Sequence, residues 1–388
     1  MRVGIDLAPL FYGNRTRGIG TYAENLVAAL AAQDTTNEYV LFVPRGAPDN
    51  YTLPLSLPQN FSLAALATPP LGRATALASH QLILPWQARA LRLDLLHSLA
   101  VPFNPSHPAV AYWQRVPTIV TLFDVMPLRF GKEVLKHTRY QRFYDFQLKA
   151  CRRAAHLITA SHTSARDLVQ RALAPREKIT VIPLAAPPLE LNGAASDDVQ
   201  ALVNTTPFLL HVGGNELQKN QETVLRAFGI LCRNPAFKHN LVLAGQHHLP
   251  DALALEQSTR AALRIVRVLN ATRADLDALY AHCDAFLFPS TAEGFGLPIL
   301  EAMRAGAPVI TSNVSALPEV AGDAALLIEP RDANALANAV RRVLGDEGVR
   351  VKLTEAGERR AQEFSWARTA EETRAVYERV FRETKKAL

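Results

Sequence analysis

The sequence is poor in cysteine and has no long apolar run. Its 388 residues include only 3 cysteines, Cys151, Cys232 and Cys283, and no CxxC pair. This spacing argues against a disulfide framework or a cysteine-based zinc site and predicts reduced core residues. No apolar stretch approaches the ~18 residues that a membrane-spanning helix needs, and Asp6 precedes any signal-peptide apolar region. We therefore expect a cytoplasmic protein.

Glycine and proline are not abundant either. With 19 Gly, 25 Pro, 48% hydrophobic and 20% charged residues, the composition excludes disordered, collagen-like and low-complexity chains. A single core stops growing near about 250–300 residues. The length therefore predicts two domains.

Neither sign of charge dominates the whole chain, but its two halves differ. Residues 1–186 carry a net charge of +9 and residues 187–388 a net charge of −3, within a total of +6. A basic half concentrates anionic partners such as nucleic acid, acidic lipid or phosphorylated substrate. The charge alone does not choose among them.

Short apolar runs alternate with helical periodicity almost from end to end, which predicts α/β architecture with parallel sheets covered by helices. Residues 44–72 are Pro-rich and expected to be irregular. Strands are expected at 3–7, 39–43, 118–122, 157–160, 180–182, 208–212, 241–244, 285–288, 309–311 and 325–328.

The alternation restarts once, after a segment rich in Pro, Ala and small polar residues. We expect domains over 1–185 and 206–365, a linker over 186–205, and a helix over 366–388 with the option of packing back on the first domain. Doubly wound sheets bind ligands at the carboxyl ends of their strands. We expect those ends to meet in an interdomain cleft.

The densest motif runs from an expected strand end at Phe288 to Gly306. Pro298 fits the first turn of a helix, and Gly306 fits the position after that helix. Glycines admit a ligand close to the backbone, and a helix start suits a phosphate or diphosphate. The motif predicts an anion-binding loop built from Gly294, Phe295, Gly296 and Leu297.

Glu293 and Glu301 lie on either side of this loop, with Glu301 expected in the first turn of the helix. Their carboxylates suit sugar or ribose hydroxyls rather than phosphate. The alternative is that Glu301 is only a favourable acid in a first turn and that the glycines are turn residues.

A second motif follows the expected strand 208–212, where Gly213 and Gly214 lead through a polar loop to a helix. A positioned ammonium stabilises a departing diphosphate without a metal, and Lys219 is the candidate. The alternative is an ordinary solvated loop lysine. No Asp-x-Asp pair is suitably placed at a strand end.

The span from Glu293 to Glu301 resembles the glutamate, seven residues, glutamate signature of glycosyltransferase family 4. Segments 279–290 and 307–330 and Ser365-Trp366 are also similar to that family. The resemblance implies a GT-B fold of two Rossmann-like domains and retaining, metal-independent transfer from a nucleotide sugar. The second domain would bind the donor and the first the acceptor.

Residue by residue, the resemblance places the ribose on Glu301 and the sugar hydroxyls on Glu293. It implies diphosphate contacts from Lys219, Gly214 and the loop 294–297. Gln218 stands where the family frequently has Arg, which lowers the expected positive charge.

In the first half, Arg17, Gly18 and Gly20 resemble the family's N-terminal glycine loop, beside the phosphate and acceptor. As a dinucleotide fingerprint they are weak, because about ten residues separate them from the strand. A plain helix-entry turn is the alternative.

Asp124 follows another expected strand, where the family commonly has His-Asp and this chain has Phe123-Asp124. A phenyl ring cannot replace a catalytic histidine. Asp124 then either orients an acceptor hydroxyl or caps the following turn. His97 and His162 also match family segments, but a lone histidine is more often structural.

Residues 132–153 hold seven basic and two acidic residues with interleaved aromatics. Such a helix either lies against an anionic membrane or presents a solvated basic face after packing. Nucleic-acid binding is disfavoured because no nucleic-acid module accompanies the charge.

The resemblance implies, for the chain as a whole, a retaining hexosyltransferase that moves a sugar from a GDP- or UDP-linked donor to an acceptor hydroxyl in polysaccharide, lipopolysaccharide or glycolipid synthesis. We expect no cofactor and no metal. The acceptor would be a carbohydrate or lipid-linked molecule, with peripheral contact to the inner face of an anionic membrane. Two alternatives stay open: a nucleotide-sugar epimerase on the same fold, and a non-catalytic nucleotide-sugar-binding protein.

Overall fold

The computed structural model describes residues 1–11, 18–44, 57–67, 75–101, 110–135, 137–189, 194–214, 216–245 and 264–387. The chain splits into two compact units. The first unit comprises Met1–Leu184 and Trp366–Leu388, and the second comprises Ala185–Ser365. The chain therefore passes between the units twice.

In the described part of the first unit, seven parallel strands pair in the order β3-β2-β1-β4-β5-β6-β7. Val3 and Ile5 of the inner strand β1 are fully buried, as expected for a parallel sheet covered on both faces. The strands are β1 (Arg2–Asp6), β2 (Glu38–Pro44), β3 (Phe61–Leu66), β4 (Leu95–Ser98), β5 (Thr118–Thr121), β6 (His156–Thr159) and β7 (Ile179–Val181).

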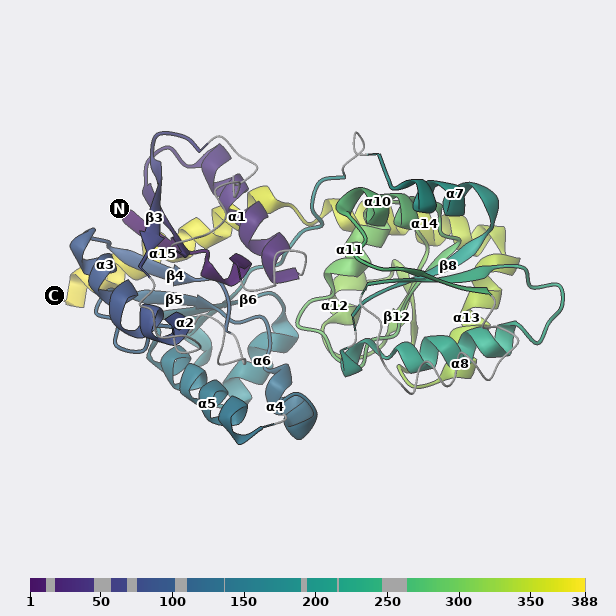
Figure 1. Ribbon diagram of the computed structural model, residues 1–388, viewed down its shortest axis with the longest axis horizontal. Helices are drawn as coiled ribbons and strands as arrows, with labels where there is room; N and C mark the ends of the chain where they lie inside the picture. The colour runs from purple at the N-terminus through teal and green to yellow at the C-terminus, as the bar shows by residue number, and fades with distance from the viewer. Residues whose placement is uncertain are drawn as a thin grey trace. The chain divides into compact units, whose positions relative to one another are not determined.

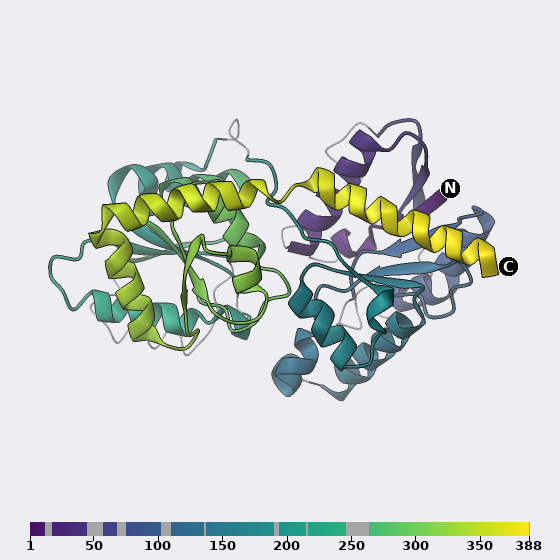
Figure 2. The ribbon, with the colours of Figure 1, turned by 180° about the vertical axis from the view of Figure 1, so that it is seen from behind.

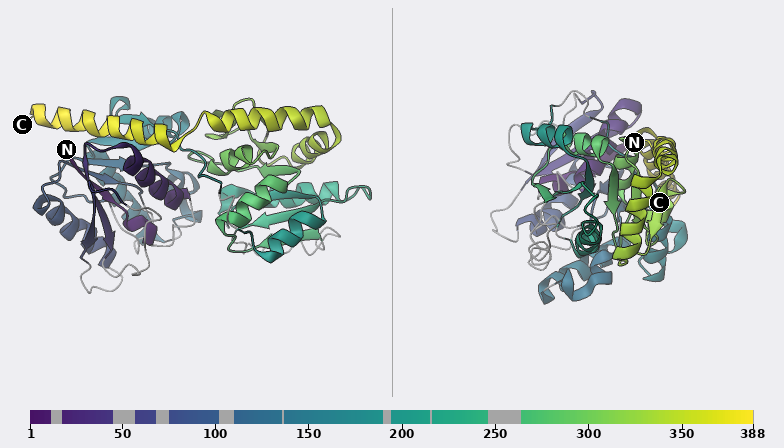
Figure 3. Two further views of the ribbon diagram at one scale, coloured as in Figure 1. Left: turned by 90° about the horizontal axis from the view of Figure 1, so that it is seen from above. Right: turned by 90° about the vertical axis from the view of Figure 1, so that its right-hand side faces the viewer.

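The helices of the first unit follow its strands and supply apolar faces to the sheet. They are α1 (Gly18–Gln33), α2 (Thr75–Ala78), α3 (Leu84–Ala90), α4 (Met126–Phe130), α5 (Thr138–Arg153), α6 (His162–Gln170) and α15 (Trp366–Ala387). The last helix, α15, lies beside α1 in the same unit, although nearly the whole chain separates them (Figure 2). Both termini lie on this unit (Figure 3).

In the described part of the second unit, six parallel strands pair in the order β10-β9-β8-β11-β12-β13. They are β8 (Phe208–Val212), β9 (Asn240–Ala244), β10 (Ile265–Val268), β11 (Ala285–Phe288), β12 (Val309–Ser312) and β13 (Ala325–Ile328). The helices are α7 (Asp197–Thr205), α8 (Gln221–Leu231), α10 (Arg273–His282), α11 (Leu297–Arg304), α12 (Leu317–Ala321), α13 (Ala333–Gly345) and α14 (Glu347–Gln362).

Helices cover both faces of the second sheet. On one face α8 packs against α13, because Val224 and Phe228 meet Leu336 and Val340 over the strands. On the other face lie α10 and α11 (Figure 1). These two helices follow β10 and β11, so their first turns stand near the carboxyl ends of the strands.

The expected α/β architecture is confirmed, with local differences. Segment 44–72 contains β3, which pairs with β2 from Tyr39↔Phe61 to Pro44↔Leu66. β10 lies at Ile265–Val268, where no strand was expected. The expected linker 186–205 ends in helix α7, whose partner is α10.

The cysteines have no disulfide partner. Cys151 and Cys283 are buried as expected, whereas Cys232 is partly exposed at the end of α8. No helix in the described ranges has the length and apolar character needed to cross a membrane.

Candidate active site

The glycine loop of the second unit has the expected strand-loop-helix form. β11 ends at Phe288, α11 begins at Leu297 with Pro298 in its first turn, and Gly306 follows the helix with φ +82°. Gly296 is the N-cap residue at φ +110°, and a Cβ there would approach Leu317 Cδ2 to 2.9 Å. Pro298 has no N–H and Ile299 N donates to Gly296 O at 2.9 Å, so Leu297 supplies the first-turn N–H that is placed for a ligand.

Lys219 and Glu293 meet at this loop. Lys219 ends the short turn Leu217–Lys219 after β8, and its Nζ lies 2.8 Å from Glu293 Oε1. The two side chains are only 17% and 10% exposed, and Nζ also lies 4.8 Å from the Phe288 ring centroid. Because β8 and β11 are neighbours, the loops at their carboxyl ends come together. Two of the candidate catalytic residues thus form one ion pair.

Hydrogen bonds tie the loop after β8 to the loop after β11. Thr291 N donates to Gln218 O at 2.8 Å. Asn220 has left-handed backbone (φ +54°), and its Nδ2 donates to Pro289 O at 2.8 Å and also to Pro330 O. Asparagine tolerates this conformation better than most residues. Asn220 was not anticipated, because its side chain makes no cap bond to α8 and instead bonds to carbonyls far along the chain.

Ser315 fixes the backbone of Glu293 from the other side. Its hydroxyl donates to Glu293 O at 2.7 Å and accepts from Glu293 N at 3.1 Å. Ser315 itself has φ +60°. This clamp was also missed, because nothing in the local sequence pairs residue 315 with residue 293.

Gly214 lies beside Glu216 at the end of β8. A Cβ on Gly214 would come within 2.4 Å of Glu216 Oε2, so a larger residue would force that carboxylate to shift. The backbone of Gly213 is also closely approached, because Gly213 O lies 2.0 Å from an ideal Cβ on Gly245. Glycine is therefore needed at position 245, after β9, where the backbone passes close to Gly213 after β8.

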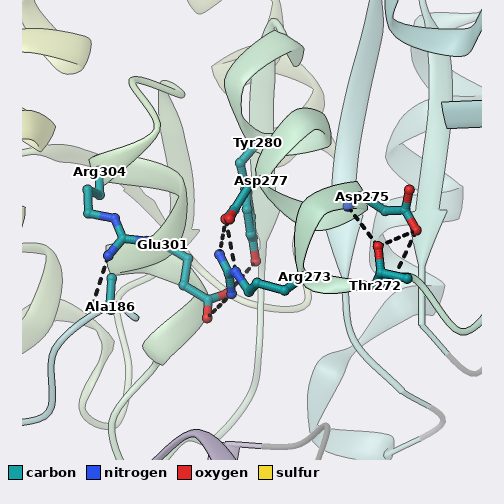
Figure 4. A network of polar contacts seen from close by, with 8 residues as sticks. All are labelled: Ala186, Thr272, Arg273, Asp275, Asp277, Tyr280, Glu301 and Arg304. Atoms are coloured by element: carbon teal, nitrogen blue, oxygen red, sulfur yellow. Dashed lines mark hydrogen bonds and ion pairs between the residues drawn. The ribbon is translucent and has the colours of Figure 1, made fainter. Parts of the chain in front are cut away.

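Glu301 lies one residue further into α11 than expected. Since the helix begins at Leu297, Glu301 is its fifth residue and falls outside the first turn. It is 6% exposed and belongs to a polar network with α10 (Figure 4). Arg273 Nη1 donates to Glu301 Oε1 at 2.8 Å, and Tyr280 Oη donates to Glu301 Oε2 at 3.0 Å.

The network balances its charges internally. Burial alone would lower the pKa of Arg273, but the carboxylates of Glu301 and Asp277 outweigh it and hold that pKa above its ordinary value. Burial and the charge of Glu301 raise the pKa of Tyr280. Burial and the nearby Arg273 lower the pKa of Arg304, whose Nη1 donates to Ala186 O at 2.9 Å.

In the first unit, the glycine pair belongs to a helix rather than to a loop. Gly18 and Gly20 are the first and third residues of α1. Arg17 lies outside the described residues.

Asp124 follows β5 and caps the next turn. Its Oδ1 accepts from Met126 N at 2.8 Å at the start of α4, which is the capping role anticipated as one option. The preceding Phe123 packs edge-to-face on Tyr22, with 5.0 Å between ring centroids. Phe123 thus joins the end of β5 to α1 by an aromatic contact.

His97 and His162 are in different environments. His97 is fully buried, with Nδ1 2.7 Å from Tyr377 Oη and Nε2 2.8 Å from Thr121 Oγ1. Burial lowers the pKa of His97 to about 3, so the imidazole is neutral at neutral pH. His162 is the exposed first residue of α6, behind the Ser161 cap.

The structure therefore assembles Lys219, Glu293 and the loop 294–297 in the second unit, with Glu301 in the second turn of α11. Asp124 and the start of α1 belong to the first unit. Across the described ranges, no three His, Cys, Asp or Glu side chains are grouped to hold a metal ion.

Two Rossmann-like units, the second with a glycine loop before a helix, are the features of the GT-B glycosyltransferase fold. Sucrose-phosphate synthase from Thermosynechococcus elongatus superimposes with a TM-score of 0.74 at 21% identity, over 99% of this chain and 100% of that chain. HepE of Anabaena, solved in complex with UDP-glucose, gives 0.70 at 16% identity and covers 100% of both chains.

Two family models match the sequence, one in each half. The model "Glycosyltransferase Family 4" matches residues 16–187, and "Glycosyl transferases group 1" matches residues 194–360. Together they span most of the chain, which belongs to this glycosyltransferase family. O-antigen chain mannosyltransferase B of Escherichia coli is 37% identical over 174 residues, 44% of this chain and 45% of that protein. The match thus spans less than half the length of this relative.

Proposed function

We propose that the protein is a retaining glycosyltransferase that uses a nucleoside-diphosphate sugar. The observation that carries this proposal is the Lys219–Glu293 ion pair beside the glycine loop. A cation and a hydroxyl-binding carboxylate stand together where a diphosphate fits a helix start. In such a donor the diphosphate is bonded directly to the sugar, so adjacent groups that bind phosphate and hydroxyls suit it.

Each part of the donor then has its own partner in the second unit. The N–H groups of loop 294–297 and Lys219 bind the diphosphate, and Glu293 accepts bonds from sugar hydroxyls. Glu301 accepts bonds from the ribose hydroxyls. HepE in complex with UDP-glucose supports a nucleotide sugar as donor, and the mannosyltransferase relative supports mannose as the sugar.

The chemistry needs no protein nucleophile and no metal. The bond between the anomeric carbon and the diphosphate oxygen breaks, and the acceptor oxygen bonds to that carbon on the same face. The departing diphosphate takes the acceptor proton. Lys219 Nζ stabilises the charge that grows on the leaving oxygen, and its low exposure strengthens that interaction.

The first unit is the proposed site for the acceptor, a carbohydrate or lipid-linked molecule of polysaccharide, lipopolysaccharide or glycolipid synthesis. Its charge supports an anionic acceptor or membrane. The outer face of α5 exposes basic residues, and Leu82, Trp86 and Trp113 are 66%, 69% and 61% exposed. Gln81 bonds both to Val110 O and to Tyr112 N, so these apolar residues come from neighbouring segments. Basic and aromatic side chains together suit peripheral contact with an anionic membrane.

Calorimetric titration with GDP, UDP and their mannose and glucose conjugates tests the proposal. We expect one nucleotide and its conjugate to bind, and Glu293→Ala to weaken the sugar conjugate more than the free nucleotide. Turnover of the donor to a free sugar or epimer without a glycosylated product would favour the epimerase, and binding without any turnover would favour a non-catalytic role. No binding by any of them would contradict the donor assignment.

A further inference from the structure

Arg273, at the start of α10, extends the proposed role of Glu301. The geometry points to Arg273 as a positioning residue, which orients the Glu301 carboxylate so that its remaining lone pairs accept bonds from the ribose hydroxyls of a nucleoside diphosphate. This inference rests on the proposed ribose-binding role of Glu301.

Both oxygens of Glu301 are held by donors on α10 (Figure 4). Oε1 accepts from Arg273 Nη1 at 2.8 Å, and Oε2 accepts from Tyr280 Oη at 3.0 Å. Two fixed donors define the rotation of the carboxylate plane. A carboxylate offers about four lone-pair sites, so each oxygen retains the capacity to accept one further bond.

Arg273 is itself anchored before it reaches Glu301. Its Nε donates to Asp277 Oδ1 at 2.9 Å, and its Nη2 also bonds to Asp277. The turn that carries it is closed by a capping box, in which Thr272 Oγ1 accepts from Asp275 N at 3.1 Å and Thr272 N donates to Asp275 Oδ2 at 2.9 Å. The guanidinium thus presents one edge to Asp277 and the other to Glu301.

The charges make this arrangement specific to arginine. The side chains of Asp277 and Glu301 are each 8% exposed, and Arg273 lies between them. A planar guanidinium bonds both carboxylates at once, whereas a lysine ammonium is a single point charge. Without the cation, two carboxylates would share a poorly solvated region, and Glu301 would lose one of its two fixed donors.

A structural ion pair between α10 and α11 would produce the same contacts, so the test must read out the ribose itself. The readout is the ratio of two dissociation constants, that of a 2′,3′-dideoxynucleoside diphosphate over that of the ribonucleoside diphosphate. Calorimetry on the full chain uses GDP or UDP, whichever binds the wild type more tightly, with its dideoxy form.

For the wild type we expect a ratio of about tenfold or more, since bonds from hydroxyls to a buried carboxylate are charge-assisted. Arg273→Gln should reduce the ratio several-fold by weakening the ribonucleotide alone. Arg273→Lys should recover part of the ratio. Tyr280→Phe should lower the ratio while the positive charge of Arg273 remains. Arg360→Gln is the matched control, because Arg360 is another half-buried arginine of this unit, bonded to Val320 O and Glu319 O. It should leave the ratio unchanged.

The outcomes distinguish the ribose-binding role of Glu301 from the positioning role of Arg273. If Glu301→Gln keeps the wild-type ratio, the ribose role of Glu301 is wrong and the proposed function loses that contact. If Glu301→Gln collapses the ratio but Arg273→Gln, Arg273→Lys and Tyr280→Phe all retain it, the positioning role is overturned. Equal weakening of both nucleotides in the Arg273 variants would also overturn it.

Discussion

Lys219 is the residue on which the leaving-group chemistry depends. Lys219→Ala should lower turnover by at least about a hundredfold, since removing one preorganised electrostatic donor typically costs that much. Lys219→Arg keeps the charge and should lose less. Initial rates of donor consumption at saturating donor measure both. If the rate of Lys219→Ala stays within a few-fold of the wild-type rate, Lys219 does not stabilise the leaving group and serves only as the ion-pair partner of Glu293.

His97 makes the stability of the first unit depend on pH. Burial depresses its pKa from 6.5 to about 3, so the unfolded chain binds one more proton between those values. The stabilisation is therefore complete above pH 6.5 and is lost as the pH falls towards 3. From pH 7 to pH 5 the loss amounts to about 2 kcal/mol for this one histidine.

The measurement is urea unfolding at both pH values for the wild type and His97→Gln. All three tryptophans, Trp86, Trp113 and Trp366, belong to the first unit, so tryptophan fluorescence reports on that unit alone. Between pH 7 and pH 5, the free energy of unfolding of the wild type should fall by about 2 kcal/mol more than that of the variant. An identical fall in both proteins would mean that His97 titrates normally.

At the residue scale, the sequence anticipated which residues carry charge at the site but not what holds them. The resemblance assigned Lys219 and Glu293 to one donor, and the pairing of β8 with β11 is what brings their loops together. Ser315 and Arg273 were not anticipated, because their bonds to Glu293 and Glu301 span 22 and 28 residues of chain. The bonds of His97 to Tyr377 and Thr121 were likewise not readable from the local sequence, whereas the bond of Asp124 to Met126 N was one of two anticipated options.

Helix α15 is the element that closes the first unit. Tyr377 bonds to His97, Arg379 Nη2 bonds to His156 Nε2 and Thr180 Oγ1 at 2.8 Å each, and Thr369 Oγ1 donates to Pro183 O at 2.8 Å. Polar groups on one helix thus reach β4, β6, β7 and the segment after β7. The helix fixes several strands at once.

Tyr377→Phe should destabilise the first unit by about 1–3 kcal/mol, because the variant leaves Nδ1 of His97 buried without its partner. Tyr140→Phe, on the half-exposed start of α5, is the control and should change the free energy by less than about 0.5 kcal/mol. Fluorescence-detected urea unfolding measures both variants. Equal effects would contradict a special role for the α15 contact.

Elements with strong apolar patterns were predictable, and weak ones were not. β11 and β13 were located to the residue, because four consecutive apolar residues end at a clear loop signal. β3 was missed because Ser62 and the surrounding prolines hide a strand that only pairing with β2 stabilises. α7 was read as linker, although its acids Asp197 and Asp198 lie in the first helical turn, where they are favourable.

At the scale of the whole molecule, the basic half is expected to bind anionic membrane while the acidic half is not. Replacing Arg142, Lys149 and Arg153 with Gln should weaken sedimentation with vesicles of acidic lipid, at about 1 kcal/mol per basic group. Trp86→Ala should weaken it further, and added salt should weaken the wild type. Lys136 of the same basic segment lies outside the described residues.

A matched triple change in the second unit is the control. Arg341, Arg342 and Lys352 are exposed on α13 and α14, and their replacement by Gln removes the same charge. Vesicle binding should survive that change. Equal loss in both triple variants would reduce the effect to total charge, and absence of wild-type binding at low salt would leave the α5 face as a solvated surface.

The most direct test of the account is transfer itself, measured with excess EDTA. The protein is given the nucleoside-diphosphate mannose that it binds and a mannosyl acceptor, and NMR identifies the anomeric configuration of the product. The account predicts a glycoside with the configuration of the donor, formed with or without EDTA and greatly reduced in Lys219→Ala. An inverted product, or activity that EDTA abolishes and magnesium restores, would contradict it.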